Sequence, residues 1–274
     1  MKSRVFQFLS FAAILLIAAH ACYAQTPART YQQMSTADQS KFISEQSRSI
    51  AKRISGSDYE FTAEFETYIR QWVDHYQRRI GNNGGDRLWK GDVRFILERG
   101  QSNASTLMSA FGARGVSPLM GLYIPFIESE YVNIQAPNSV GAIGMFQFLP
   151  KTGERYGLTR EDLLDVGKSA DAAARYISDN LANFKTDPMK EALALLAYNR
   201  GEKRVAMDLE LVVTGPEVRC SICAITSARA RLDESFRSEN GDYVPRFFAA
   251  AIIGENPEVF SLHLQPLSSL QGER

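Results

Sequence analysis

The sequence has little cysteine, little histidine and no excess of charge of either sign. Its 274 residues include three cysteines, three histidines, 31 basic and 31 acidic side chains, so the formal charge is zero. A zero net charge argues against a protein that holds nucleic acid by bulk electrostatic attraction. The few cysteines and histidines also limit any metal site, and we expect none. With 45% apolar and 23% charged residues, the composition is that of a globular protein and excludes disordered and collagen-like chains.

The N-terminus has the pattern of an export signal. Two basic residues precede an apolar run at 8–19, and small residues follow it. We therefore predict a signal peptide over 1–24, because the run is shorter than the ~20 residues of a membrane span. Cleavage is expected after Ala24, or alternatively after Ala21. Two further alternatives are lipid attachment at Cys22, although the leucine usual three positions upstream is missing, and an uncleaved membrane anchor.

Export changes both the charge and the cysteine chemistry of the protein. Without the signal peptide the chain has 29 basic and 31 acidic residues, and its cysteines are Cys220 and Cys223. We place the protein in the periplasm, where disulfides persist. A single CxxC pair lacks the further ligands of a zinc site, and the strand-helix context of a thioredoxin-type motif is missing. We therefore predict a Cys220–Cys223 disulfide that pins a loop.

The remaining sequence predicts a mainly α-helical fold in which any sheet is small and peripheral. Apolar residues recur at helical spacing over 61–76, ahead of a glycine- and asparagine-rich break at 81–85. We assign the aromatic stripe of this helix to the core, with sugar stacking as the alternative. The other expected helices are a polar helix with a linker at 26–56, two short helices within 92–114, one starting at Ser117-Pro118, and helices at 168–184, 187–199 and around 244–252.

Two motifs carry side chains suited to carbohydrate chemistry. Residues 124–129 read IPFIES and place Glu128 at the end of an apolar run. In an apolar pocket such a carboxyl has a raised pKa and can act as a general acid, whereas a solvated Glu on a helix surface is the alternative. Residues 141–150 read GAIGMFQFLP. Gly141 and Gly144 let the backbone approach a ligand closely, and Gln147 offers a donor and an acceptor to a sugar hydroxyl or N-acetyl group.

Two further motifs follow along the chain. Residues 197–201 read AYNRG, in which we expect Gly201 to close a helix in the left-handed conformation, so that Tyr198 and Asn199 face a cleft. Glu239 and Tyr243 then precede the last helix.

The set of motifs and its order resemble the soluble lytic transglycosylase (SLT) catalytic domain of bacterial enzymes that cleave peptidoglycan. The resemblance covers about residues 116–260 and is strongest to the membrane-bound type D branch. It implies a lysozyme-like helical domain of the goose-type lysozyme class, with Glu128 as catalytic acid/base and peptidoglycan strands as substrate, without a cofactor. By motif position, the implied substrate-binding residues are Ser129, Met145, Gln147, Tyr198, Asn199, Glu239 and Tyr243, with Gly141 and Gly144 in the cleft loop.

The sequence departs from the family pattern at several points. Asn240 stands where the last motif usually has threonine, which weakens the assignment of Glu239. Arg200 replaces a residue that is often small, and we expect it to change the charge at the cleft rim. Type D relatives usually carry C-terminal peptidoglycan-binding repeats, and no such repeat is seen before Arg274. We divide the chain into the signal peptide, a helical N-terminal extension at 25–115, the catalytic domain at 116–265 and a tail at 266–274.

The implied mechanism requires one acid and no protein nucleophile. Glu130 is the nearest second carboxylate, but residues two apart on a helix do not face the same way. The resemblance implies a 1,6-anhydromuramic product, whereas a lysozyme-like muramidase would use water, and a non-catalytic peptidoglycan-binding scaffold would be expected to lack the acid. An enzyme serving a cell-wall or secretion machine would differ in its partner, which the sequence does not identify.

Overall fold

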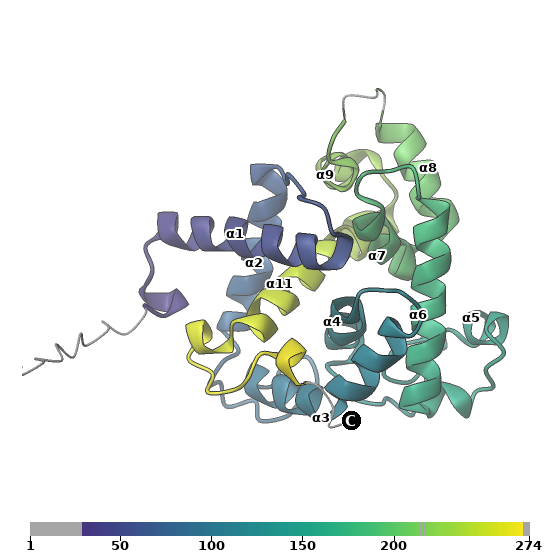
Figure 1. Ribbon diagram of the computed structural model, residues 1–274, viewed down its shortest axis with the longest axis horizontal. Helices are drawn as coiled ribbons and strands as arrows, with labels where there is room; N and C mark the ends of the chain where they lie inside the picture. The colour runs from purple at the N-terminus through teal and green to yellow at the C-terminus, as the bar shows by residue number, and fades with distance from the viewer. Residues whose placement is uncertain (1–28, 214, 216–217, 271–274) are drawn as a thin grey trace, which may run out of the picture.

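The computed structural model describes residues 29–270 except 214, 216 and 217 (Figure 1). The expected signal peptide and Cys22 lie outside this part of the chain. The described residues form helices and no strand, apart from an isolated antiparallel bridge between Ile143 and Phe148, so the prediction of a mainly α-helical fold is confirmed. The α-helices are α1 (Thr36–Ser55), α2 (Ala63–Gln77), α3 (Val93–Gly112), α4 (Pro118–Ser129), α5 (Pro150–Arg155), α6 (Val166–Asn183), α7 (Lys190–Arg200), α8 (Glu202–Val212), α9 (Ser221–Ser227), α10 (Glu234–Ser238) and α11 (Tyr243–Glu255).

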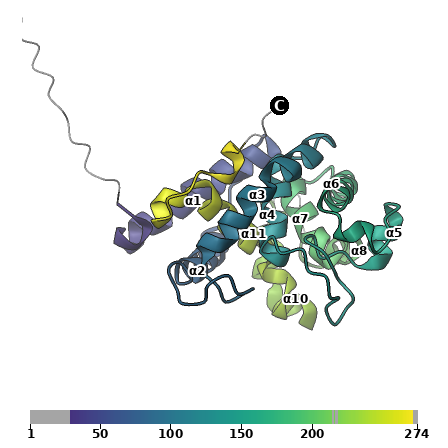
Figure 2. The ribbon, with the colours of Figure 1, turned by 90° about the horizontal axis from the view of Figure 1, so that it is seen from below.

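Helices α4 and α11 form the centre of the molecule because they are apolar on nearly every face. Ten of the twelve residues of α4 and eleven of the thirteen residues of α11 are buried. A helix that is apolar all round needs neighbours on all sides. Helix α4 packs against α3, α11 and α6, while α2 covers α11 (Figures 1 and 2). No helix in the described ranges is long and apolar enough to cross a membrane.

The aromatic stripe of α2 packs in the core, as predicted. Phe65, Ile69, Val73 and Tyr76 are almost completely buried, because the apolar face of α2 packs on α11. Trp72 is one of the partly exposed members of the stripe, and the guanidinium of Arg246 lies over its ring at 4.9 Å from the centroid. The sugar-stacking alternative for this helix is therefore not supported.

The prediction of two short helices within 92–114 is wrong, because α3 is one continuous helix of 20 residues. Gly100 lies in its middle, where a glycine usually weakens a helix. A Cβ at this position would come within 2.8 Å of the Tyr131 ring. The glycine therefore allows α3 and Tyr131 to pack closely, and tertiary packing outweighs the local helix propensity.

The region around Gly201 also differs from its expected geometry. Gly201 has a positive φ of 83°, but its ψ of 139° is extended, so it is not a left-handed cap. The chain turns here directly from α7 into α8, a helix that the sequence did not predict. Helix α7 begins at Lys190, later than expected, because Asp187 first accepts a hydrogen bond from the Met189 amide in a turn.

Helices on both sides of residue 115 contribute to one hydrophobic core. Ile43 of α1 and Ile69 of α2 belong to the same buried cluster as Phe247 of α11. The expected C-terminal tail also packs on the body, since Leu267 is fully buried and the Ser268 amide donates a hydrogen bond to Glu255. The N-terminal extension therefore supports the helices that carry the motifs.

Candidate active site

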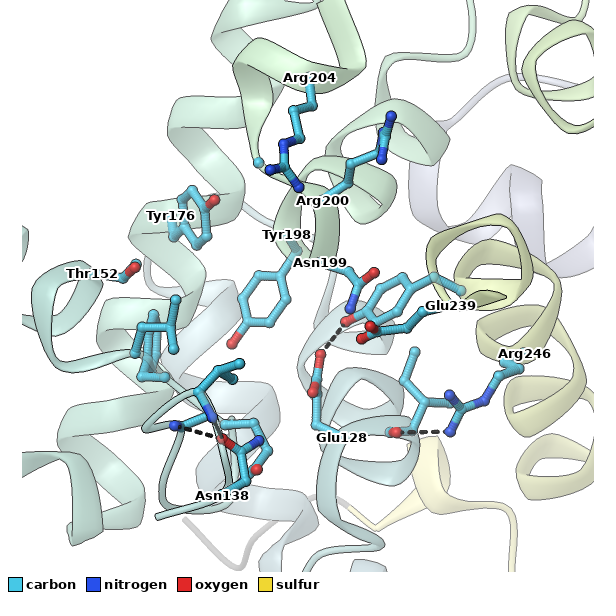
Figure 3. Close-up of a pocket in the computed structure, with 18 of the residues that line it drawn as sticks. Glu128, Asn138, Thr152, Tyr176, Tyr198, Asn199, Arg200, Arg204, Glu239 and Arg246 are labelled. Carbon is cyan, nitrogen blue, oxygen red and sulfur yellow. Dashed lines mark hydrogen bonds between the residues drawn. The ribbon is translucent and has the colours of Figure 1, made fainter. Parts of the chain in front are cut away.

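A cleft of about 830 Å³ lies over the C-terminal end of α4. In Figure 3, Glu128 lies between Thr152 and Tyr176 on one side and Arg246 on the other. Of the residues named as catalytic or substrate-binding from the sequence, six line this cleft, namely Glu128, Gln147, Tyr198, Asn199, Glu239 and Tyr243.

The end of α4 directs Glu128 and Glu130 to different surroundings. Glu128 lies in the last turn and keeps part of its surface open to the cleft. Glu130 and Tyr131 then adopt left-handed backbone conformations with φ of 49° and 60°, which end the helix. The Glu130 side chain turns inward to an ion pair with Arg79 at 2.7 Å, and it is only 1% exposed. Glu130 therefore cannot serve as a second carboxylate in the cleft.

The surroundings of Glu128 favour its protonated form. Desolvation by the protein raises its pKa from the ordinary value of 4.5 to about 7. The Tyr243 hydroxyl donates a hydrogen bond of 2.7 Å to Glu128 Oε1 and opposes this rise, as does the charge of Arg246, while the charge of Glu239 adds to it. A carboxyl with a pKa near 7 can donate a proton and take one back at neutral pH.

The loop between α4 and α5 forms one wall of the cleft. Gln147 lines the wall with a left-handed backbone (φ 49°), and its amide Nε2 donates a hydrogen bond of 2.8 Å to the Gly144 carbonyl. This bond leaves the Gln147 side-chain oxygen available as an acceptor. Gly144 has a φ of 76°, and a Cβ on it would lie 2.4 Å from the Leu163 carbonyl oxygen, so only glycine fits there.

Tyr198 and Asn199 lie in the last turn of α7 and face the cleft (Figure 3). The Tyr198 hydroxyl donates a hydrogen bond of 2.9 Å to the Phe146 carbonyl and ties α7 to the cleft loop. Asn199 Oδ1 accepts a hydrogen bond of 2.6 Å from Asn240 Nδ2. The Asn199 amide is oriented by this bond and presents its NH₂ group as a donor.

Arg200 lines the cleft, but its side chain is almost fully buried and its charge is paired with two carboxylates, so it adds less to the charge at the rim than the sequence suggested. Its guanidinium binds both carboxylate oxygens of Asp208 and of Asp233, and it donates a further hydrogen bond of 3.0 Å to Asn240 Oδ1. The departure of Asn240 from the family motif is thus coupled to that of Arg200. Together they support Asn199, which lines the same cleft.

Ser129 and Met145 are corrected from substrate-binding to structural positions. Ser129 is 0% exposed and Met145 is 2% exposed, and neither lines the cleft. The Ser129 hydroxyl donates a hydrogen bond of 2.7 Å to the Met145 carbonyl, which fastens the cleft loop to α4 behind Glu128. Gly141 and Gly144 do not line the cleft themselves, but they shape the loop whose residues do, such as Gln147.

The cleft contains side chains that sequence reasoning missed. Trp89 lies just after the predicted break at 81–85, Asn138 lies in the loop after α4, and Arg155 and Arg246 lie in α5 and α11; none of the four was singled out from the sequence. Arg246 donates a hydrogen bond of 3.0 Å to the Ile127 carbonyl next to Glu128. Nothing in the spacing along the chain indicated these contributions, since they depend on packing between distant elements.

Cys220 and Cys223 form a disulfide away from the cleft, with their Cα atoms 5.2 Å apart. The Cys223 sulfur accepts a hydrogen bond of 3.4 Å from the Thr62 amide at the start of α2. This hydrogen bond ties α9 to the start of α2. Within the described residues, no group of three or more His, Cys, Asp or Glu side chains is placed to hold a metal ion.

Comparison with known families gives a match in the middle of the chain. Residues 107–214 match the family described as transglycosylase SLT domain. This segment is therefore similar to the lytic transglycosylases, which act on peptidoglycan, and the helical architecture of the chain is lysozyme-like. The matched segment contains Glu128, Gln147, Tyr198 and Asn199, while Tyr243 lies beyond it. No curated protein sequence matches the chain.

Proposed function

We propose that this protein is a peptidoglycan lytic transglycosylase that cleaves the β-1,4 bond between N-acetylmuramic acid and N-acetylglucosamine and leaves 1,6-anhydromuramic ends. The observation that carries the proposal is Glu128, which faces the cleft with a pKa raised to about 7 and a hydrogen bond from Tyr243. It lies within the segment that matches the transglycosylase SLT domain. A protonated carboxyl at this position suits the first proton transfer.

The reaction needs Glu128 in two protonation states. The Glu128 carboxyl donates its proton to the glycosidic oxygen as the bond from that oxygen to C1 of the muramic acid breaks. The N-acetyl group of the same sugar supports the developing positive charge at C1. Glu128, now a carboxylate, takes the proton from the 6-hydroxyl, whose oxygen bonds to C1. The enzyme returns to its starting state, and no water is consumed.

The cleft residues have distinct parts in this mechanism. The Asn199 NH₂ group and the Gln147 side-chain oxygen are offered to polar groups of the sugars, such as the N-acetyl group. Tyr243 stabilises the carboxylate form of Glu128 between the two proton transfers. Tyr198 holds the cleft loop through the Phe146 carbonyl.

One observation favours a second candidate, a muramidase that uses water. Glu239 lines the cleft, and its charge contributes to the raised pKa of Glu128. Inverting glycosidases place a second carboxylate to activate a water molecule. A non-catalytic scaffold is disfavoured, because Glu128 and its Tyr243 partner are both in place.

The mass of the released muropeptides tests the proposal. We expect digestion of purified murein sacculi to yield anhydro-muropeptides, each lighter by one water molecule than the hydrolytic product. Mass spectrometry of the released fragments separates the two reactions, with Glu128→Gln as the inactive control. A product mixture with only reducing muramic ends would identify the muramidase instead.

The proposal extends to the place of action and the branch of the family. We propose export to the periplasm, on the basis of the N-terminal pattern, with membrane attachment through the alternatives at 1–24. The type D assignment rests on the motif sequences. Localising the protein and sequencing its mature N-terminus test the export and the membrane attachment.

The pH dependence of activity should follow Glu128. We expect kcat/KM to fall as the pH rises above about 7, because the carboxyl then loses the proton it must donate. Tyr243→Phe removes a hydrogen bond that stabilises the carboxylate, so the pKa rises and this basic limb moves to higher pH. The measurement is a kcat/KM profile on soluble glycan strands.

Tyr176→Phe is the matched control for the pH profile. Tyr176 also lines the cleft, but its hydroxyl donates to the Ala197 carbonyl and not to Glu128. The basic limb of the kcat/KM profile of Tyr176→Phe should therefore lie at the same pH as that of the wild-type protein. A Tyr243→Phe profile that is unchanged, or that moves to lower pH, would contradict the role given to this hydrogen bond.

A further inference from the structure

Trp89 is an exposed aromatic side chain on the wall of the cleft, and it comes from outside the matched segment. It is 43% exposed. In the described part of the chain the large exposed apolar side chains are five, and three of them, Trp89, Val140 and Leu149, line the cleft. The other two, Met207 and Leu211, lie on α8 away from it. Apolar side chains left open in one place indicate a binding surface.

Trp89 is held in place by the buried carboxylate that follows the catalytic motif. Its backbone amide donates a hydrogen bond of 3.0 Å to Glu130 Oε2. Glu130 in turn pairs with Arg79 at 2.7 Å and lies 3.9 Å from Arg99, and Arg79 Nε donates to the Gly91 carbonyl at 2.9 Å. A charged group this deeply buried is costly unless it is paired. The Glu130 pairing therefore links the loop that carries Trp89 to the helix end that carries Glu128.

The loop around Trp89 is compact. The Asp92 amide bonds to the Gly85 carbonyl at 2.8 Å, and the Asn82 side chain bonds to the Lys90 carbonyl at 3.0 Å. A Cβ on Gly91 would lie 2.4 Å from the Gly85 carbonyl oxygen, so the loop closes on itself without room for a side chain there. Trp89 itself has a φ of 64°, an unusual conformation for a bulky residue. A loop held this closely loses little conformational entropy when a ligand binds.

We propose that Trp89 forms a sugar-binding subsite of the cleft, supplied by the N-terminal extension and positioned by Glu130. The ligand is a pyranose ring of a glycan strand, whose C–H face stacks on the indole. A flat aromatic surface suits a sugar ring because it buries apolar area while the hydroxyl groups at the ring edge stay hydrated. This subsite rests on the proposed function, since it serves the same strand that Glu128 cleaves. It gives the segment before the matched domain a direct part in substrate binding.

The test measures binding of peptide-free glycan strands from murein to Glu128→Gln protein, which does not turn them over. In this background we expect Trp89→Ala to weaken binding about tenfold, as for a tryptophan at the centre of an interface, and Trp89→Phe to stay within about threefold. Trp89→Asn is a second truncation, because asparagine tolerates a positive φ. Leu211→Ala, which removes an exposed apolar side chain away from the cleft, should leave the dissociation constant unchanged. In the active enzyme, Trp89→Ala should raise KM more than it lowers kcat.

Three results would overturn the subsite. The first is an unchanged affinity for glycan strands in both Trp89→Ala and Trp89→Asn, and the second is an equal loss of affinity in Trp89→Phe and Trp89→Ala. The third is a loss of affinity seen only with peptide-bearing strands, which would assign Trp89 to the peptide stem. Thermal unfolding of each variant separates lost binding from lost folding. The proposed function fails separately: it would fail if the wild-type protein released no anhydro-muropeptides, whereas unchanged binding in the Trp89 variants alongside those products would remove only the subsite.

Discussion

Glu128→Gln should lower turnover of peptidoglycan by about 10⁴-fold, the upper end of the range for general acid–base catalysis, because the same group acts first as acid and then as base. Glutamine has nearly the shape of glutamic acid but cannot give up a proton to the glycosidic oxygen. It can still accept the hydrogen bond from Tyr243, which is 2.7 Å long in the wild-type protein. Folding and strand binding should therefore remain close to wild type. The measurement is the rate of muropeptide release from sacculi, together with the affinity for glycan strands.

Two other carboxylates in the cleft provide matched controls for Glu128. Glu202 and Glu239 also line the cleft. Glu202→Gln should leave the rate largely unchanged. Glu239→Gln should lower the pKa of Glu128 modestly, because it removes a negative charge that raises it, and should not abolish turnover. A Glu128→Gln protein that digests sacculi at the wild-type rate would exclude the mechanism, and a Glu239→Gln protein as inactive as Glu128→Gln would favour the muramidase.

Arg200→Ala should lower the free energy of unfolding by about 3–5 kcal/mol, because it leaves the buried Asp208 carboxylate without its partner. The Arg200 side chain is 3% exposed and that of Asp208 is 7% exposed, while Asp233 is open to solvent and can be hydrated. The same change removes one of the two donors to Asn240 Oδ1, and Asn240 orients Asn199 in the cleft. We therefore expect a loss of activity at temperatures where the protein is still folded. Urea unfolding measures the stability, and a rate assay below the unfolding transition measures the effect on the site.

Arg204→Ala is the control for Arg200→Ala. Arg204 lies four residues further along the chain, in α8, and its side chain is exposed. Its unfolding free energy should stay within about 0.5 kcal/mol of wild type, as for most surface substitutions. Arg200→Met combined with Asp208→Leu should recover part of the stability lost in Arg200→Ala, because no buried charge is then left unpaired. Equal unfolding midpoints for Arg200→Ala and Arg204→Ala would show that the buried pairing does not stabilise the fold.

Local patterns in the sequence were sufficient for much of the helical architecture. The apolar spacing over 61–76 corresponds to α2, and Pro118 starts α4 at its first helical position. Local patterns predicted two short helices within 92–114 and missed the continuous helix α3. Gly100, a weak helix former, is tolerated inside α3 because Tyr131 packs against it. Helical periodicity and capping are properties of neighbouring residues, so they can be recognised without knowledge of the rest of the molecule.

The candidate site was predictable only in part. The sequence indicated Glu128, at the end of an apolar run, as the candidate acid, but it placed Ser129 and Met145 in contact with substrate, whereas both are buried. The sequence could not reveal which face of the C-terminal end of α4 is open to the cleft. It also gave no indication of Trp89, because the loop that carries this residue has no catalytic motif.

The sequence by itself therefore determined the helical class, the order of the motifs and the acid that the proposed reaction requires. Only the tertiary structure decided that Glu128 faces the cleft while Glu130 turns inward to Arg79, and that Tyr243, 115 residues further along, donates to Glu128. The pKa of about 7 at Glu128 arises from desolvation and from charges on other helices. Such effects depend on distance in space and not on separation along the chain, so they exist only once the helices have packed.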